Sequence, residues 1–159
     1  MAKQLHVKLD KCTGCRNCEL VCSWNRGKNF NPDNSAVSVV DYEEGFISVP
    51  MMCLQCEEAP CIKACNVESL SRDANGTVKI DLEKCVGCKL CIDVCPQRSM
   101  YFNEASKKVF KCELCNGDPV CVKHCPPGCL AYTDKKEEGF GWEKAITLTH
   151  KRVAKEAAK

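Results

Sequence analysis

The chain has 159 residues, including 17 cysteines, and its 23 basic and 21 acidic residues give a net charge of +2. The mixed charges argue against nucleic acid as a partner, and no apolar run reaches the roughly 18 residues of a membrane helix. The first residues lack the apolar core of a secretion signal, so we expect a cytoplasmic protein whose cysteines bind metal instead of forming disulfides.

The first predicted elements surround a group of four cysteines. Residues 5–9 alternate between apolar and polar side chains, which predicts a short strand. The first group, Cys12-Thr-Gly-Cys15-Arg-Asn-Cys18-Glu-Leu-Val-Cys22, follows, and residues 19–25 are predicted to form a short helix. Residues 37–50 contain two strand-like runs on either side of Glu44-Gly45, which predicts a hairpin before the second group.

The remaining groups alternate with further hairpins. The second group is Cys53-Leu-Gln-Cys56-Glu-Glu-Ala-Pro60-Cys61-Ile-Lys-Ala-Cys65, and the hairpin predicted after it turns at Asn75-Gly76. The third group, Cys85-Val-Gly-Cys88-Lys-Leu-Cys91-Ile-Asp-Val-Cys95-Pro96, precedes a hairpin of residues 100–102 and 109–111. The fourth group is Cys112-Glu-Leu-Cys115-Asn-Gly-Asp-Pro-Val-Cys121-Val-Lys-His-Cys125-Pro126, and residues 129–132 form a last predicted strand.

The end of the chain differs in composition from the rest. Residues 135–159 begin as a polar linker and continue as a tail with good helix formers at its end. Two interpretations stay open for this tail. It is a loosely ordered terminus, or it docks on a partner through Trp142, Ile146 and Leu148.

All four groups share one internal pattern. Two cysteines are separated by two residues, a third follows after a gap of two, four, two and five residues in chain order, and the fourth comes after three more. The third group reproduces the bacterial ferredoxin run C-x2-C-x2-C-x3-C-P, and the first departs from it only at Ser23. In that run three thiolates bind one [4Fe–4S] cluster and the fourth binds its neighbour. Sixteen grouped cysteines therefore predict four [4Fe–4S] clusters.

Three questions stay open on the residues alone. Structural zinc also uses C-x2-C pairs, although it would leave the regular third and fourth cysteines unexplained. The groups can pair as first with second and third with fourth, or as first with fourth and second with third. The remaining cysteine, Cys129, is a small buried thiol, an alternative ligand or a redox-active group.

Four lysines lie beside the predicted ligands: Lys11, Lys84, Lys89 and Lys111. Either they are ordinary solvated surface residues, or they weaken the negative field of the clusters and raise the reduction potentials. The chain has no glycine-rich phosphate-binding motif and no recognisable nucleophile–base pair. We therefore predict no catalytic residues and expect that the chain is not an enzyme on its own.

The second group resembles a known family. Its run from Cys53 to Cys61 is similar to the C-x2-C-E-x2-P-C signature of iron–sulfur electron-transfer subunits that carry four [4Fe–4S] clusters. Such subunits accompany molybdenum- or tungsten-pterin oxidoreductases, formate hydrogenlyase, and some hydrogenase or carbon monoxide dehydrogenase systems. The resemblance covers residues 5–133, and the run from Cys12 to Trp24 is similar to small subunits beside tungsten aldehyde oxidoreductases.

The resemblance implies an α+β fold of two bacterial-ferredoxin-like dicluster modules, one inserted in the other, with short hairpins and helices and a C-terminal tail. The polyferredoxin domain would span residues 1–134, with an outer module of about 1–35 and 105–134 and an inner module of about 50–104. In this family the first group pairs with the fourth and the second with the third. The implied ligand sets are Cys12, Cys15, Cys18 and Cys125; Cys22, Cys112, Cys115 and Cys121; Cys53, Cys56, Cys61 and Cys95; and Cys65, Cys85, Cys88 and Cys91.

The resemblance also implies a function. The chain would relay electrons between a catalytic subunit, foremost a tungsten- or molybdenum-pterin aldehyde oxidoreductase of anaerobic metabolism, and a further flavin or ferredoxin partner. Alternatives are a formate, hydrogenase or carbon monoxide dehydrogenase system, a free-standing polyferredoxin, and a zinc-organised interaction module.

Overall fold

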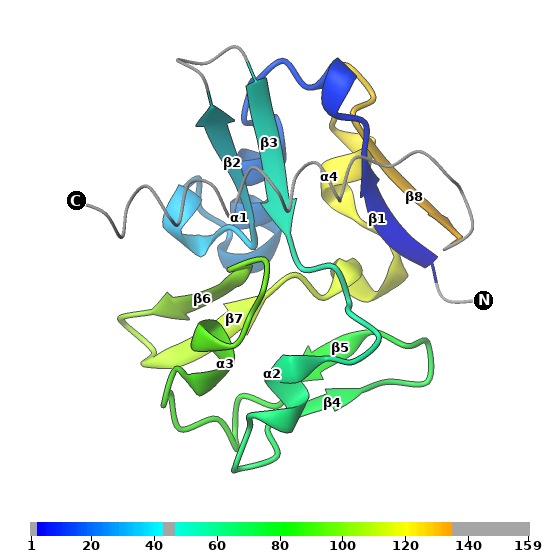
Figure 1. Ribbon diagram of the computed structural model, residues 1–159. Coiled ribbons are helices and arrows are strands. Elements are labelled where there is room, and N and C mark those ends of the chain that lie inside the picture. The colour runs from blue at the N-terminus through cyan, green and yellow to red at the C-terminus, as the bar shows by residue number, and fades with distance from the viewer. Residues whose placement is uncertain (1–2, 43–46, 135–159) are drawn as a thin grey trace.

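The structure is a computed structural model that describes residues 3–42 and 47–134. These residues form short helices and four two-stranded antiparallel sheets (Figure 1). Among them, no helix has the length and apolar character to cross a membrane. The turn at Glu44-Gly45 and the linker and tail of residues 135–159 lie outside the described residues.

The first half of the fold joins the two ends of the described chain. Strand β1 (Lys3–Val7) pairs with β8 (Leu130–Asp134), in a register that places Val7 opposite Leu130. Helix α1 (Asn17–Gly27) packs against both α4 (Val120–Lys123) and the hairpin of β2 (Val37–Tyr42) and β3 (Ile47–Met52). We call this half the α1/α4 half. Its core is formed by apolar side chains and thiols: Leu5, Val7, Cys18, Cys22, Ala36, Val37, Val39, Met52, Phe110, Cys112, Leu114, Cys121, Cys129 and Leu130.

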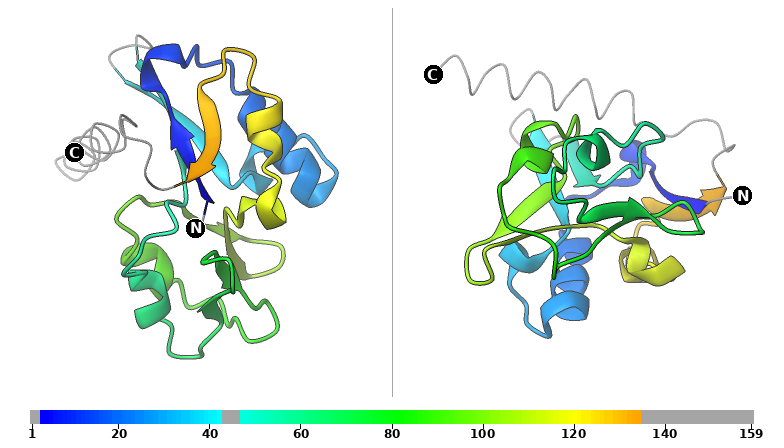
Figure 2. Two further views of the ribbon diagram at one scale, coloured as in Figure 1. Left: turned by 90° about the vertical axis from the view of Figure 1, so that its right-hand side faces the viewer. Right: turned by 90° about the horizontal axis from the view of Figure 1, so that it is seen from below.

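The second half is built from the middle of the chain. Helix α2 (Pro60–Lys63) packs against α3 (Leu90–Asp93), and the hairpin of β4 (Leu70–Arg72) and β5 (Val78–Ile80) lies beside them. We call this the α2/α3 half, and it has a core of its own: Ala59, Leu70, Val78, Cys85, Cys91, Met100 and Val109. This half lies below the α1/α4 half in Figure 1 and in the left view of Figure 2.

The hairpin of β6 (Met100–Asn103) and β7 (Lys108–Lys111) connects the halves. Successive side chains of a strand point to opposite faces of its sheet. Accordingly, Val109 belongs to the core of the α2/α3 half, whereas Phe110 belongs to the core of the α1/α4 half. Tyr101 stacks on Phe110 with 5.5 Å between the ring centroids. The hairpin is therefore part of both cores.

The elements agree with the predicted α+β class of small helices and hairpins. The helix predicted at residues 19–25 is longer, because it begins at Asn17 and continues to Gly27. Lys28 follows in a left-handed conformation, and its N–H donates a hydrogen bond to the carbonyl of Trp24. The hairpins at residues 37–52, 70–80 and 100–111 are as expected. The insertion of one cluster-binding module in the other stays a prediction, because it depends on which cysteines share a cluster.

Candidate metal centres

The four cysteine groups share a backbone turn as well as a spacing. The residue before the second cysteine of each group has a left-handed conformation, with φ between 53° and 72°: Gly14, Gln55, Gly87 and Leu114. Three groups repeat this conformation two residues before the third cysteine, at Arg16, Ala59 and Lys89. Left-handed residues placed between the cysteines curl the backbone into a concave loop whose thiols can face a common centre. The repeat found in the sequence is thus also a repeat in three dimensions.

The first and fourth groups meet in the α1/α4 half. One cavity is lined by Cys12, Cys15, Cys18 and Cys125, together with Cys129. The amide of Asn17 donates to the carbonyl of His124 at 2.6 Å and so ties the two groups together beside this cavity.

A second set of thiols from the same two groups is more deeply buried. Cys22, Cys112 and Cys121 belong to the core of the α1/α4 half. Burial raises the pKa of the Cys121 thiol, and the neighbouring Cys112, Cys22 and Cys115 add to that shift. These four sulfurs are therefore electrostatic neighbours.

The second and third groups meet in the α2/α3 half. A cavity there is lined by Cys53, Cys56, Cys61 and Cys95. Burial raises the pKa of the Cys91 thiol to about 11, with smaller contributions from Cys61, Cys65 and Cys85. In both halves, the fourth cysteine of one group thus lies near the first three of another.

Several sulfurs accept hydrogen bonds. The backbone N–H of Ala36 donates to Cys22 Sγ at 3.3 Å, and the backbone N–H of Ser69 donates to Cys65 Sγ at 3.3 Å. The side-chain amide of Asn25 donates to Cys115 Sγ at 3.7 Å. Such bonds stabilise thiolates and are among the factors that set the potentials of iron–sulfur clusters. Thiols gathered from two groups, some of them with N–H donors to sulfur, fit the donor chemistry of a [4Fe–4S] cluster.

Cys129 is fully buried, with an exposed fraction of 1%. It lies beside Cys12 in the first cavity, and a hydrogen bond between the two thiols lowers the pKa of Cys12 and raises that of Cys129. Its burial is as predicted, and its neighbour is a predicted ligand.

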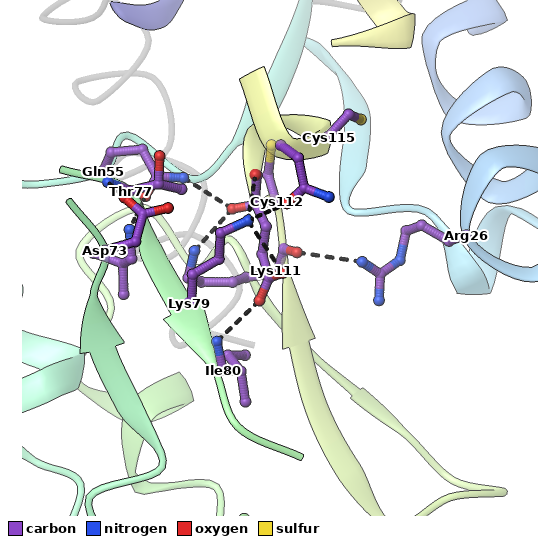
Figure 3. A network of polar contacts seen from close by, with 12 residues as sticks. Arg26, Gln55, Asp73, Thr77, Lys79, Ile80, Lys111, Cys112 and Cys115 are labelled. Carbon is purple, nitrogen blue, oxygen red and sulfur yellow. Dashed lines mark hydrogen bonds and ion pairs between the residues drawn. The ribbon is translucent and has the colours of Figure 1, made fainter. Parts of the chain in front are cut away.

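A polar network joins the two halves (Figure 3). The side chain of Gln55 donates to the carbonyl of Cys112 at 2.9 Å and accepts from the N–H of Val78 at 2.8 Å. The N–H of Ile80 donates to the carboxylate of Glu113 at 2.9 Å. Group two and strand β5 are thus bonded directly to group four. Nothing in the local sequence marked Gln55 or Glu113, because each acts on a residue distant in the chain.

The four lysines beside the ligands differ in exposure. Lys11, Lys84 and Lys89 are exposed, whereas the exposed fraction of Lys111 is 1%. The Nζ atom of Lys111 donates to the carbonyl of Cys112 at 2.8 Å. The interpretation as solvated surface is therefore wrong for Lys111.

Comparison with known proteins identifies the domain. Residues 45–135, more than half of the chain, match the family described as 4Fe-4S dicluster domain. The chain belongs to this family. This family and the 17 cysteines of the chain fit the predicted cofactors, four [4Fe–4S] clusters.

Relatives of the dicluster protein are named as iron–sulfur or polyferredoxin-like subunits. It is 33% identical over 116 residues to a putative iron–sulfur subunit of dimethyl sulfoxide reductase from Halobacterium salinarum, in an alignment that covers 62% of this chain and 44% of that one. It is 41% identical over 88 residues to the polyferredoxin-like subunit of an aliphatic sulfonate oxidoreductase from Pyrococcus furiosus, over 55% of this chain and 50% of that one. The chain thus spans about half the length of these curated relatives.

A solved structure resembles the whole chain. A chain of the "Active site complex BamBC of Benzoyl Coenzyme A reductase in complex with Benzoyl-CoA" aligns with a TM-score of 0.51 and 27% identity, over 99% of both chains. The names of the curated relatives agree with the predicted class of iron–sulfur electron-transfer subunits.

Proposed function

We propose that this chain is the electron-transfer subunit of a larger oxidoreductase complex, in which four [4Fe–4S] clusters form one relay. Clusters of this kind accept and release single electrons when bound. The chain's own residues would hold them at fixed positions, keep water away from the buried sulfurs, and donate hydrogen bonds to others. The observation that carries the proposal is the gathering of all four cysteine groups into two halves with a shared buried boundary.

The ligand sets of the proposal follow the crossed pairing. Group one pairs with group four and group two with group three, so that the α2/α3 half is an inner module inserted in the outer one. The sets are Cys12, Cys15, Cys18 and Cys125; Cys22, Cys112, Cys115 and Cys121; Cys53, Cys56, Cys61 and Cys95; and Cys65, Cys85, Cys88 and Cys91. The packing of α1 on α4 and of α2 on α3, and the cysteine lining of the two cavities, support these sets.

The same sets suggest an order for the relay. Cys15 and Cys88 are exposed, and they belong to the first and last sets. Cys112 and Cys53, which belong to the two middle sets, are electrostatic neighbours across the boundary of the halves. Electrons would therefore enter near one exposed thiolate, cross at the boundary and leave near the other.

The partner we propose is a catalytic subunit with a tungsten- or molybdenum-pterin cofactor, foremost an aldehyde oxidoreductase. Its support is the run from Cys12 to Trp24 and the relatives named as subunits of other oxidoreductases. A flavin protein or ferredoxin would take the electrons at the other end. A cytoplasmic location belongs to the same proposal, because thiolate ligands suit a reducing compartment.

The test is anaerobic purification from the native host through a tag on this chain. We expect a second, larger chain in constant ratio, tungsten or molybdenum in the complex, and bleaching of the visible iron–sulfur absorbance when the substrate of that chain is added. Nickel in place of tungsten and molybdenum would assign a hydrogenase or carbon monoxide dehydrogenase system. Purification of this chain alone would contradict the subunit role and favour a free polyferredoxin.

A further inference from the structure

Lys111 has an uncommon environment for a lysine. It is the last residue of β7, and it is the largest of the fully buried side chains among the described residues. Lysine is almost never fully buried unless its charge is compensated, because removing an ammonium from water is costly. Within residues 3–42 and 47–134, no carboxylate forms an ion pair with it. Its compensation must therefore come from other negative groups.

The groups that Lys111 faces are predicted cluster ligands from both halves of the fold. Burial raises the pKa of the Cys112 thiol to about 12, with Cys53 and Cys22 adding to the shift and the Lys111 ammonium opposing it. Burial likewise raises the pKa of the Cys61 thiol, and Lys111 again opposes the shift. The lysine therefore interacts with one sulfur of each middle ligand set.

Hydrogen bonds hold the ammonium at this position. Its Nζ atom and the side-chain amide of Gln55 both donate to the carbonyl of Cys112, at 2.8 and 2.9 Å (Figure 3). The carbonyl of Lys111 accepts from Arg26 at 3.5 Å. Lysine, glutamine and cysteine thus form one fixed unit at the boundary between the halves.

The effect of such a charge on a cluster has a definite sign. A [4Fe–4S] core bound by four thiolates is negatively charged, and reduction adds one more negative charge. A cation nearby stabilises the reduced form more than the oxidised form, and it does so more strongly in a buried environment than in water. A buried ammonium without a carboxylate partner should therefore raise the potentials of the clusters that it faces.

We propose that Lys111 is a positioning residue for electron transfer: its charge raises the reduction potentials of the two middle clusters and so sets the free energy of electron transfer between the halves. This inference rests on the ligand sets of the proposed function. The lysine touches no substrate and acts only through the field at its two neighbouring ligand sets.

The chain offers a matched control. Lys84 directly precedes the first cysteine of group three, as Lys111 precedes that of group four. However, the Lys84 side chain is 60% exposed, and its Nζ atom lies 3.9 Å from Asp81. Water and this carboxylate should screen its charge, so the same substitution at Lys84 should leave the potentials nearly unchanged.

The experiment compares four variants of the anaerobically purified complex: Lys111→Gln, Lys111→Met, Lys111→Arg and Lys84→Met. Gln keeps a donor for the Cys112 carbonyl without the charge, and Arg keeps the charge. Potentials are read from a redox titration followed by electron paramagnetic resonance. In both neutral Lys111 variants we expect two of the four reduction potentials to fall by at least about 59 mV. For a one-electron couple this shift equals a tenfold change in the ratio of oxidised to reduced cluster. Lys111→Arg and Lys84→Met should match the unmodified protein.

Unchanged potentials in both neutral variants would overturn the proposal. So would loss of iron in both of them, since the lysine would then serve the fold and not the potential. The unmodified protein separates this inference from the proposed function. If it lacks the four clusters, the proposed function fails. If it holds them and the neutral variants show no shift, only the inference about Lys111 fails.

Discussion

At the residue scale, Cys129 is a buried thiol that lies beside a predicted ligand set. It lies in the first cavity with Cys12, Cys15, Cys18 and Cys125, so proximity alone would make it a fifth candidate. However, Cys129 lies outside the spacing that the sixteen grouped cysteines share, and its thiol forms a hydrogen bond with that of Cys12.

We therefore expect Cys129→Ala to keep all four clusters. The substitution removes a hydrogen bond and leaves a small cavity, but it removes no ligand. Iron and acid-labile sulfide per chain should equal those of the unmodified protein, whereas Cys12→Ala should lose about four irons. An equal loss in the two variants would mean that Cys129 is itself a ligand.

At the element scale, the loop of group three depends on the close approach of the β6–β7 hairpin. A Cβ atom added at Gly87 would clash with the backbone carbonyl oxygen of Lys107, which is part of this hairpin. Gly87 also has a φ of +72°. Gly117 has a φ of +94°, but apart from its two chain neighbours no residue that the structure describes has an atom within 4 Å of its added Cβ.

This pair separates backbone strain from steric conflict. Gly117→Ala should cost only the strain of a left-handed alanine, about 1–2 kcal/mol. Gly87→Ala should cost the same strain and should also displace the hairpin, so that the cluster bound by that loop is lost with about four irons. Iron content and the urea midpoint of cluster bleaching would measure both effects. Equal values for the two variants would contradict the role of the hairpin.

The hairpins themselves could be predicted from the sequence, because alternating residues and turn signals such as Asn75-Gly76 are local. The left-handed conformation at Gly14 and Gly87 could also be predicted from the sequence. The same conformation at Gln55 and Leu114 could not be predicted, because tertiary packing imposes it. The pairing of β1 with β8 joins the two ends of the described chain, and no local pattern indicates such a partner.

At the scale of the whole molecule, the cysteine count and spacing predicted the number of clusters, but the assignment of ligands required knowledge of which groups meet. The residues alone left two pairings open. The burial of Lys111 was equally hidden, because its local sequence is the same as that of exposed Lys84: each is a lysine directly before the first cysteine of a group. Only packing between the two halves distinguishes them.

Double variants distinguish the two pairings. In the crossed pairing Cys22 shares a cluster with Cys115, so Cys22→Ala with Cys115→Ala should lose no more iron than either alone and retain about twelve irons. Cys22→Ala with Cys56→Ala should remove two clusters and retain about eight irons. The sequential pairing predicts the reverse, because Cys22 would then share a cluster with Cys56.

The central claim, four [4Fe–4S] clusters held by this one chain, is tested most directly by native mass spectrometry of the chain released anaerobically from its complex. The mass of the chain plus about four Fe₄S₄ units, with no zinc, is the result that this account predicts. A chain that carries two such units, or zinc in place of iron and sulfide, would contradict it.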